Sequence, residues 1–259
     1  YGMMLVHNIE EARWRDVGSH LNQYVKFEPT EEIVSAFIIK DFDTYRDIVT
    51  TSRLGMIKKT AVIDLEVKRY NRMYDIMNLS KDDRLVGAHI SKQDDDILIV
   101  TRMGNVIRLE LNDITQIGVR AKGVIAIKLK KHDYVVSSAI LSDESDVVFI
   151  SEKSQFKRMK QDDILVNNRA TQGSSMMREI KSNPNFVMYV GAYNIQDVIE
   201  LYNEKMILLN VKDIPLMTSD QSFKNVLDES DFVVVKKRLE VPKVKNPVVI
   251  EEQPLKFDL

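Results

Sequence analysis

The sequence repeats one pattern at a period close to 50 residues. The clearest copies begin at Gly55 (Gly-Met-Ile-Lys-Lys-Thr), Gly104 (Gly-Asn-Val-Ile-Arg-Leu) and Ser154 (Ser-Gln-Phe-Lys-Arg-Met). A weaker copy begins at Glu204, and a truncated one begins at Tyr1. The intervals between the four later copies are 49, 50 and 50 residues. A repeat this regular requires each copy to form one supersecondary unit that stacks on its neighbours.

Each copy has the pattern of a strand, a tight turn and a second strand. An aspartate precedes an apolar, β-branched run, as in Asp47-Ile-Val-Thr-Thr and Asp146-Val-Val-Phe-Ile. Eight residues after the aspartate, or seven in the last copy, comes the turn position, which is glycine at positions 55 and 104. Glycine tolerates the positive φ that tight hairpins often demand. A short second strand, an Asp-rich connection, a loop with Arg and Gly, and an apolar segment such as Val124-Ile-Ala-Ile-Lys-Leu complete the copy.

This pattern predicts an all-β fold, a propeller-like β-pinwheel of four-stranded blades of roughly 50 residues each. Radial closure protects the many strand edges, and a β-sandwich has no reason to repeat at this period. We expect the pinwheel to occupy residues 1–238, with about five blades of which the first is truncated. Residues 239–259 contain three of the six prolines and are expected to form an extended C-terminal tail.

Composition excludes several classes of protein. No apolar run approaches the 18 to 20 residues, roughly, that span a bilayer, so we expect no membrane association. The chain has no cysteine, which suits a reducing cytoplasm. Its four histidines are scattered, and it contains neither a P-loop nor a GxGxxG motif. We therefore expect no catalytic residue, metal site or cofactor. Because Tyr1 lies inside a copy of the repeat, the chain is interpreted as a fragment of a longer protein.

Charge alternates in phase with the repeat, although the net charge is only −2. Lys/Arg and Asp/Glu number six and two in residues 53–72, seven and two in 102–131, and six and two in 153–178. The net charge of the other stretches is −4 for 27–52, −3 for 73–101, −5 for 132–152 and −3 for 179–204. Features in phase with a repeat occupy equivalent places on every blade. The pattern therefore predicts a basic rim that suits the phosphates of a bent polyanion.

The candidate phosphate-binding cations fall at two positions of the repeat, the second strand and the loop that follows it. Those of the second strand are Lys58, Lys59, Arg108, Lys157 and Arg158, and those of the loops are Arg13, Arg15, Lys68, Arg69, Arg72, Arg120, Lys122 and Arg169. In the last copy the strand positions are Ile207 and Leu208, so the basic track is expected to fade toward the C-terminus. The alternative hypothesis is a protein-interaction propeller whose charges only keep it soluble; it predicts an exposed apolar patch instead.

Three segments resemble a known family: Arg13-Trp-Arg-Asp-Val-Gly-Ser-His-Leu, Gly55-Met-Ile-Lys-Lys with Arg69-Tyr-Asn-Arg, and Arg120-Ala-Lys-Gly-Val. With the recurring Lys-Lys/Arg strands, they are similar to the C-terminal β-pinwheel domain of bacterial type IIA topoisomerase A subunits. The resemblance extends over residues 1 to about 235. The first segment resembles a second-blade loop in the topoisomerase IV member of this family from Gram-positive bacteria.

This resemblance implies a non-catalytic domain that binds and bends duplex DNA, and in which neighbouring blades exchange a hairpin. It also implies two protein partners, the remainder of the same topoisomerase polypeptide and the separate ATPase polypeptide, in a parent enzyme that relaxes and decatenates DNA. The parent's catalytic residues would lie outside this chain. The corresponding gyrase polypeptide, whose domain wraps DNA, is the alternative; its heptapeptide Gln-Arg-Arg-Gly-Gly-Lys-Gly has only a partial counterpart, at Gln116–Gly123. The Arg13-Trp-Arg segment and the last loop, which lacks Arg, favour topoisomerase IV.

Overall fold

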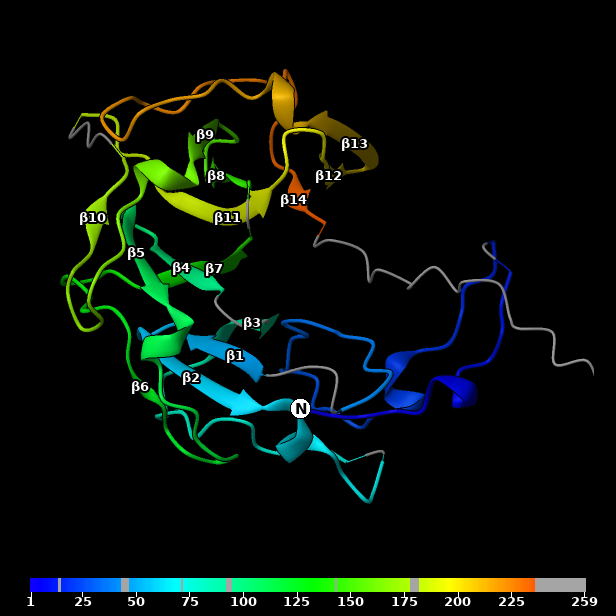
Figure 1. The fold of residues 1–259 in the computed structure, drawn as a ribbon. Helices are drawn as coiled ribbons and strands as arrows, with labels where there is room; N and C mark the ends of the chain where they lie inside the picture. Colours follow the sequence, from blue (N-terminus) through cyan, green and yellow to red (C-terminus); the bar gives the residue numbers. More distant parts are fainter. Residues whose placement is uncertain are drawn as a thin grey trace, which may run out of the picture.

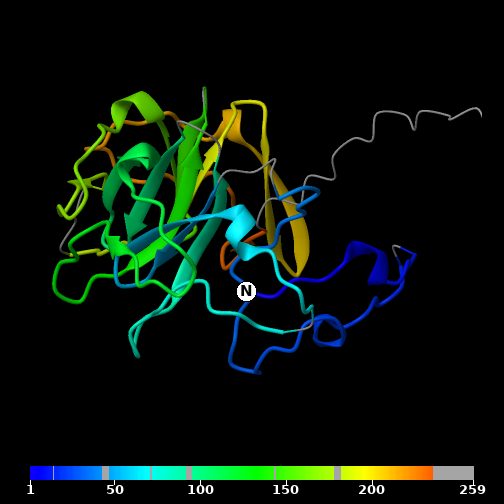
Figure 2. The same ribbon diagram turned by 60° about the horizontal axis from the view of Figure 1, so that its bottom comes forward.

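A computed structural model describes residues 1–13, 15–42, 47–70, 72–91, 95–142, 144–177 and 182–235. In this part of the chain, four antiparallel sheets follow one another along an arc, and the N-terminal segment lies beside the first sheet (Figures 1 and 2). We call each sheet a blade. The expected tail, 239–259, lies outside the described residues. Among the described residues, no helix has the length and apolar character to cross a membrane.

The four blades share one strand order. Blade 1 consists of β3 (Leu85–Ser91), β1 (Asp47–Ser52), β2 (Met56–Ala61) and β6 (Val124–Ile125). Blade 2 consists of β7 (Val135–Leu141), β4 (Asp96–Thr101), β5 (Asn105–Glu110) and β10 (Ser174–Ser175). Blade 3 consists of β11 (Val187–Tyr193), β8 (Asp146–Ser151) and β9 (Phe156–Lys160), and blade 4 of β14 (Val233–Val234), β12 (Val198–Asn203) and β13 (Lys205–Asn210). The predicted all-β pinwheel is confirmed.

Short 3₁₀ turns connect the blades. The turns η3 (Val62–Leu65), η4 (Leu111–Asp113), η5 (Gln161–Asp163) and η6 (Val211–Asp213) each follow the second strand of a hairpin directly. They are the Asp-rich connections of the sequence pattern. Two further turns, η1 (Val6–Asn8) and η2 (Leu21–Gln23), lie in the N-terminal segment. Each interblade turn therefore starts the loop that follows the second strand.

The hairpin turns have the backbone conformation that the repeat predicted. Gly55, Gly104, Ser154 and Glu204 have φ values of 84°, 79°, 57° and 53°. A Cβ atom on Gly55 would lie 2.6 Å from the carbonyl oxygen of Ile127, which belongs to the next repeat. Glycine is thus required there both by the left-handed conformation and by the close approach of the following repeat. Ser154 and Glu204 adopt the same conformation at a steric cost.

Blades 1 and 2 take their outermost strand from the next repeat. β6 pairs with β2 although β4 and β5 lie between them in the sequence, and β10 pairs with β5 in the same way. In blade 3 the equivalent pairing is a single bridge between Phe156 and Lys224. The family resemblance implied that neighbouring blades exchange a hairpin; in the described residues the exchanged element is one short strand. The four-stranded blade is confirmed for blades 1 and 2.

The hydrophobic core is divided among the interfaces between blades. One cluster joins Val49 and Ile57 of blade 1 to Ile97 and Ile107 of blade 2. A second joins blades 2 and 3, and a third joins blades 3 and 4. A fourth cluster joins blade 1 to the N-terminal segment. The blades therefore bury most of their apolar side chains by stacking on their neighbours, which is the physical reason for the repeat.

The truncated first copy pairs with the following copy in the same way. Gly2 forms an antiparallel bridge with Met73, and the Tyr1 hydroxyl donates to the carbonyl oxygen of Leu65 at 3.2 Å. Met56 makes the equivalent antiparallel pairing with Ile125, one repeat later. The first two residues thus lie where a second strand would lie. Beyond that bridge, the described residues up to 42 contain only η1 and η2, so the structure shows four sheets for five copies.

Candidate nucleic-acid interface

Three lysines of the second strands are buried, which corrects their predicted place on the exposed rim. Lys58 and Lys157 are 0% exposed and Lys59 is 5% exposed. Their ammonium groups donate to backbone carbonyls: Lys58 to Ile76 and Lys59 to Leu111, both at 2.5 Å. The physical reason is that loops packed over the second strands bring carbonyl oxygens within reach of the lysine ammonium groups, Ile76 of the same copy for Lys58 and Leu111 of the next copy for Lys59. These ammonium groups are not available to phosphates.

Lys157 has the most complete set of partners. Its Nζ atom donates to the carbonyl oxygens of Met176 (2.9 Å), Ser219 (3.1 Å) and Gln221 (2.9 Å). Burial lowers the pKa of Lys157 to about 8, and the negative charge of Asp220 opposes part of that shift. Burial also lowers the pKa of Lys58. Lys58 donates to a carbonyl of its own copy, whereas Lys157 donates to carbonyls of its own copy and of the next one. An ammonium group held by neutral acceptors in this way is costly to keep charged.

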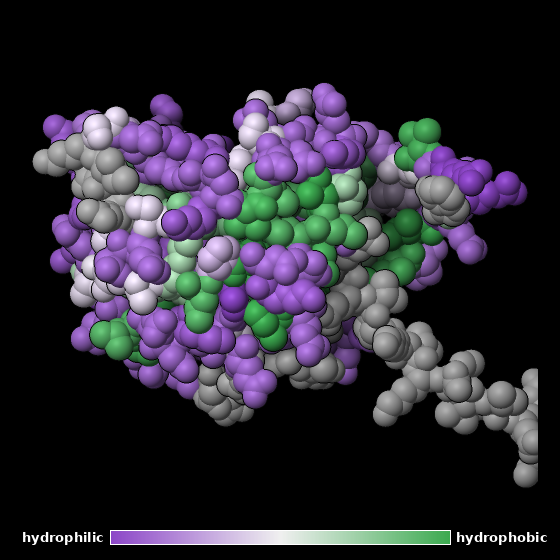
Figure 3. Space-filling model, turned by 90° about the horizontal axis from the view of Figure 1, so that it is seen from above, coloured by the Kyte–Doolittle hydropathy of each residue, from purple (hydrophilic) through white to green (hydrophobic). Residues whose placement is uncertain are grey.

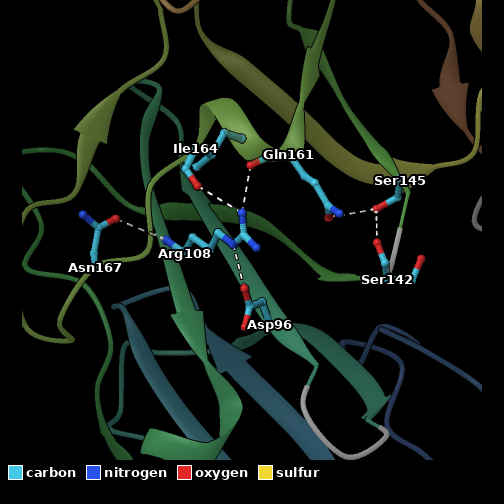
Figure 4. Close-up of polar contacts among 7 residues, drawn as sticks. All are labelled: Asp96, Arg108, Ser142, Ser145, Gln161, Ile164 and Asn167. Carbon is cyan, nitrogen blue, oxygen red and sulfur yellow. Dashed lines mark hydrogen bonds and ion pairs between the residues drawn. The ribbon is translucent and has the colours of Figure 1, made fainter.

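Arg108 joins two blades (Figure 4). Its Nε atom lies 2.7 Å from Oδ2 of Asp96, which begins the neighbouring strand β4. Its Nη1 atom donates to the carbonyl oxygens of Gln161 (2.9 Å) and Ile164 (3.2 Å), at the two ends of η5 in the next repeat. The side chain is 18% exposed. The guanidinium is therefore committed to a carboxylate of its own blade and to carbonyls of the following one.

Arg158 repeats this arrangement fifty residues later. Its Nη1 atom lies 2.6 Å from Oδ2 of Asp146, and its Nε atom donates to the carbonyl oxygen of Ile214 at 2.8 Å, just after η6. Lys160 also pairs with Asp146, at 2.9 Å. The Arg158 side chain is 11% exposed. Sequence analysis placed both arginines on the DNA-binding surface; the structure shows that their polar groups are largely occupied by protein partners.

We call Lys59, Arg108 and Arg158, with their carbonyl acceptors, the interblade latches. The three cations occupy one position of the repeat, because Lys59 faces Val49, Arg108 faces Leu98 and Arg158 faces Val148 in the hairpin register. The fourth copy has Leu208 at this position, opposite Glu200, and its side chain is 64% exposed. The latch is thus a property of the first three blades.

The loop cations, in contrast, are exposed. Lys68, Arg69, Arg72, Arg120, Lys122 and Arg169 all lie on the surface. Backbone hydrogen bonds join the loops of successive repeats: Asn78 donates to Ala121 (3.1 Å), Ala170 to Ala126 (2.7 Å) and Lys128 to Thr171 (2.7 Å). The loops 68–70, 72–78, 119–128 and 168–175 therefore form one continuous strip across the blades, which we call the loop track.

The loop track contains one exposed cation that sequence reasoning missed. Lys128 is exposed and lies beside the loop of Arg169, since its amide donates to Thr171. Lys128 lies in the apolar segment that begins at Val124, and the strand β6 within this segment ends at Ile125. Acidic side chains also border the track: Glu110 and Asp113 line the same shallow hollow as Asn168 and Arg169. The track is basic along its loops and acidic at its edge.

The N-terminal cations lie apart from the track. Arg13 and Arg15 are exposed in the segment that extends to one side of blade 1 (Figures 1 and 2). The amide of Arg13 donates to Oδ2 of Asp16 at 2.9 Å. Trp14 lies outside the described residues, as does Asp94 of the aspartate run 94–96. Among the residues that are described, no group of three or more metal-ligating side chains could hold a metal ion.

Comparison with known proteins assigns this architecture to a family. The family model described as "DNA gyrase C-terminal domain, beta-propeller" matches residues 46–92, 95–142 and 145–190, one match for each of the first three blades. The chain belongs to this family. The matched residues hold the three latches, whereas blade 4, with Leu208, lies beyond them. The gyrase C-terminal domain family thus accounts for the part of the chain in which the repeat is clearest.

Full-length relatives of this family are much longer than the chain. The DNA topoisomerase 4 A subunit of Bacillus subtilis is 30% identical over 216 residues, which is 83% of this chain and 27% of the relative. The same protein from Staphylococcus epidermidis is 26% identical over 240 residues, which is 90% of this chain and 29% of the relative. The chain therefore spans less than a third of the relatives that it matches.

Solved structures confirm the fold. The C-terminal domain of DNA topoisomerase IV superposes with a TM-score of 0.80 at 29% identity, over 86% of this chain and 70% of the solved one. The DNA gyrase A C-terminal domain superposes with a TM-score of 0.73 at 17% identity, over 85% and 74% of the two chains. The second likeness shows the shared fold of the gyrase C-terminal domain family and no more.

Proposed function

We propose that this domain binds duplex DNA along the loop track and bends it, as a non-catalytic part of a topoisomerase IV of the kind found in Gram-positive bacteria. The observation that supports the proposal is the continuity of the track: exposed cations on three successive loops are joined by backbone hydrogen bonds. Lys and Arg side chains spaced along a curved strip can neutralise successive phosphates without reading the base sequence.

The burial of Lys58, Lys59 and Lys157 narrows the proposed contact surface. The phosphate ligands that we retain are Lys68, Arg69, Arg72, Arg120, Lys122, Lys128 and Arg169, with Arg13 and Arg15 extending the surface beside blade 1. Bending a site of 20 to 30 base pairs by 40 to 90° costs on the order of 1 to 6 kcal/mol. Several phosphate contacts must offset that cost, and the loops of three blades offer enough cations.

Topoisomerase IV is the proposed parent because its relatives and its solved C-terminal domain are 26 to 30% identical to the chain, against 17% for the gyrase domain. The partners would then be the remainder of the same topoisomerase polypeptide and the separate ATPase polypeptide, in a bacterial cytoplasm at the nucleoid. The domain would support relaxation and decatenation of DNA. In the gyrase alternative, the same loop track would bind a longer segment of DNA that wraps around the domain.

A salt titration tests the proposal. We expect the domain to bind unrelated duplexes with equal affinity, and log Kd to vary steeply with log salt concentration in fluorescence anisotropy. The variant Arg69→Gln/Arg120→Gln/Arg169→Gln should reduce the salt slope by about 2 to 3, since each lost phosphate contact removes about 0.9. The control Lys81→Gln/Lys153→Gln/Lys205→Gln makes the same charge change at exposed lysines outside the loops of the track. Equal slopes for the two triple variants would contradict the proposal.

A second candidate function, protein interaction, is favoured by one observation. The face of the molecule seen from above has an apolar region at its centre (Figure 3). The sheet and loop of the last repeat expose large apolar side chains at Met206, Leu208, Leu216 and Val233. An exposed apolar patch of this kind marks many interaction surfaces. If the wild-type domain shows no salt-dependent DNA binding, this candidate replaces the first.

A further inference from the structure

We infer that the interblade latches, above all Arg108 and Arg158, are positioning residues that fix the curvature of the loop track and thereby the bend of bound DNA. The inference rests on the proposed function. It assigns a distinct role to two cations that sequence patterning places among the phosphate ligands. The first evidence is where the acceptors of the latches lie.

Lys59 and Arg108 each hold the start of the loop that presents the exposed cations of the next blade, and Arg158 holds the equivalent loop of blade 4, which has no Arg. The Arg108 side chain binds both ends of η5, and its backbone forms a parallel bridge with Val166 and accepts from the amide of Asn167 at 2.8 Å. Arg169 follows two residues later. The whole segment 161–167 is thus fixed to β5 of the preceding blade, so the position of Arg169 follows the orientation of blade 2.

The other two latches have the same backbone register. Lys59 bridges Gln116 and accepts from the amide of Ile117 at 2.9 Å, just before the loop with Arg120. Arg158 bridges Leu216 and accepts from the amide of Met217 at 2.8 Å. The backbone of the joint between blades therefore has the same register three times, and joints with one backbone register generate a similar rotation from blade to blade.

The chemistry of the joint distinguishes a latch from a phosphate ligand. Asp96 and Asp146 hold the two guanidinium groups, and these carboxylates are themselves largely buried, at 15% and 2% exposure. A planar guanidinium can bind the carboxylate and the carbonyls at once, whereas an ammonium is a point donor. Lys59 latches through an ammonium group, and Leu208 has no charged group at the equivalent position. The guanidinium charge is neutralised within the blade, so it contributes little to phosphate attraction.

Three variants of the domain test this inference. Arg108→Met removes the guanidinium of the latch. Asp96→Asn removes the carboxylate that pairs with it and keeps the arginine charge. Arg108→Lys keeps the positive charge but replaces the planar guanidinium by an ammonium group. Each variant is first compared with the wild type by thermal melting and by hydrogen exchange of the Ile164 and Asn167 amides without DNA. A 30-base-pair duplex, about the length that one bend occupies, then carries a dye at each end. Its FRET efficiency reports the bend, and anisotropy reports affinity and salt slope.

We expect Arg108→Met and Asp96→Asn to accelerate hydrogen exchange of both amides. The increase in FRET efficiency on DNA binding should fall to about half that of the wild type, because a more mobile loop track bends DNA less. Their salt slope should stay within about 0.5 of the wild-type value, which is less than the change expected from the loss of one phosphate contact. If Arg108→Met does not fold, Asp96→Asn and Arg108→Lys decide the question with the same readouts.

Two results would overturn the inference while leaving DNA binding intact. In the first, Arg108→Met lowers the salt slope by about 1 and Asp96→Asn leaves the bend unchanged, which makes Arg108 a phosphate ligand. In the second, all three variants bend DNA as the wild type does. A wild-type domain that shows no salt-dependent binding would instead refute the proposed function and the inference with it.

Discussion

Arg108 on β5 and Asp96 on β4 form an ion pair of 2.7 Å, and twelve residues separate them in the sequence, as they separate Arg158 from Asp146. In the hairpin register the arginine stands two positions before the partner of the aspartate, so the two side chains are diagonal neighbours on one face. The recurring Asp and Arg of the repeat therefore form one ion pair within each of these two hairpins.

Breaking the Asp146 pair should destabilise the domain strongly. Asp146→Ala removes a buried carboxylate that binds both Arg158 and Lys160, and it leaves a guanidinium at 11% exposure without its counter-ion. We expect a loss of about 3 kcal/mol or more in urea unfolding. The matched control is Glu152→Ala, which removes a half-exposed pair with Arg102 and should cost less than about 1 kcal/mol. Equal losses for the two variants would show that Asp146 has no special structural role.

Lys157 should make stability rise with pH. The pKa of its buried ammonium is about 8 in the folded domain and near 10.5 in the unfolded chain. Between these values the unfolded state binds more protons, so the free energy of unfolding increases with pH, by at most about 1.4 kcal/mol per unit. We expect the stability difference between the wild type and Lys157→Met to grow in favour of the wild type from pH 8 to 10, measured by denaturant titration. A constant difference would refute the shifted pKa.

Two glycines of the exchanged segment should resist substitution. Gly123 and Gly173 have φ values of 85° and 67°, and a Cβ on Gly123 would lie 2.6 Å from the carbonyl oxygen of Ile57. Gly123→Ala should therefore cost more than about 1 kcal/mol. Gly118→Ala, five residues earlier, meets nothing within 4 Å and has no positive φ. It should be neutral or slightly stabilising in the same unfolding measurement; a comparable loss there would contradict the steric argument.

The last hairpin should gain stability from a glycine. Glu204 occupies the turn position with a φ of 53°, where the first two copies have Gly55 and Gly104. Glu204→Gly relieves the left-handed strain, and we expect a gain of about 0.5 to 1 kcal/mol. The same change at Asn203, which has no positive φ and lies in β12, should destabilise. A Glu204→Gly variant that melts below the wild type would argue against strain at this turn.

The hairpins could be predicted from the sequence because their determinants are local. The aspartate, the β-branched run and the turn residue fix β1, β4, β8 and β12 and the positive φ that follows them. The exposure of the loop cations also agrees with the sequence, since Arg and Gly in a loop need no tertiary partner to be placed at the surface; their role as phosphate ligands stays a proposal.

The fate of the strand cations depends on distant residues. Lys59 and Leu111 are 52 residues apart, and Arg108 and Ile164 are 56 apart, so no local pattern shows that a carbonyl will cover the ammonium or guanidinium. The signal that was present is the spacing of aspartate and arginine within one copy, which predicts a diagonal ion pair once the hairpin register is known. A period in charge identifies equivalent positions, but it does not distinguish a solvated position from a covered one.

The exchange of the outermost strand has a consequence for how such a domain changes in evolution. The sequence unit and the sheet are out of phase, since β6 completes a blade whose other strands precede β4. Deleting or duplicating one full period of 50 residues joins equivalent points of two copies, so a sheet that receives its outer strand from the copy that follows still receives it. Blade number can therefore change by recombination without any new interface having to arise. A cut between whole sheets, in contrast, always leaves one sheet incomplete.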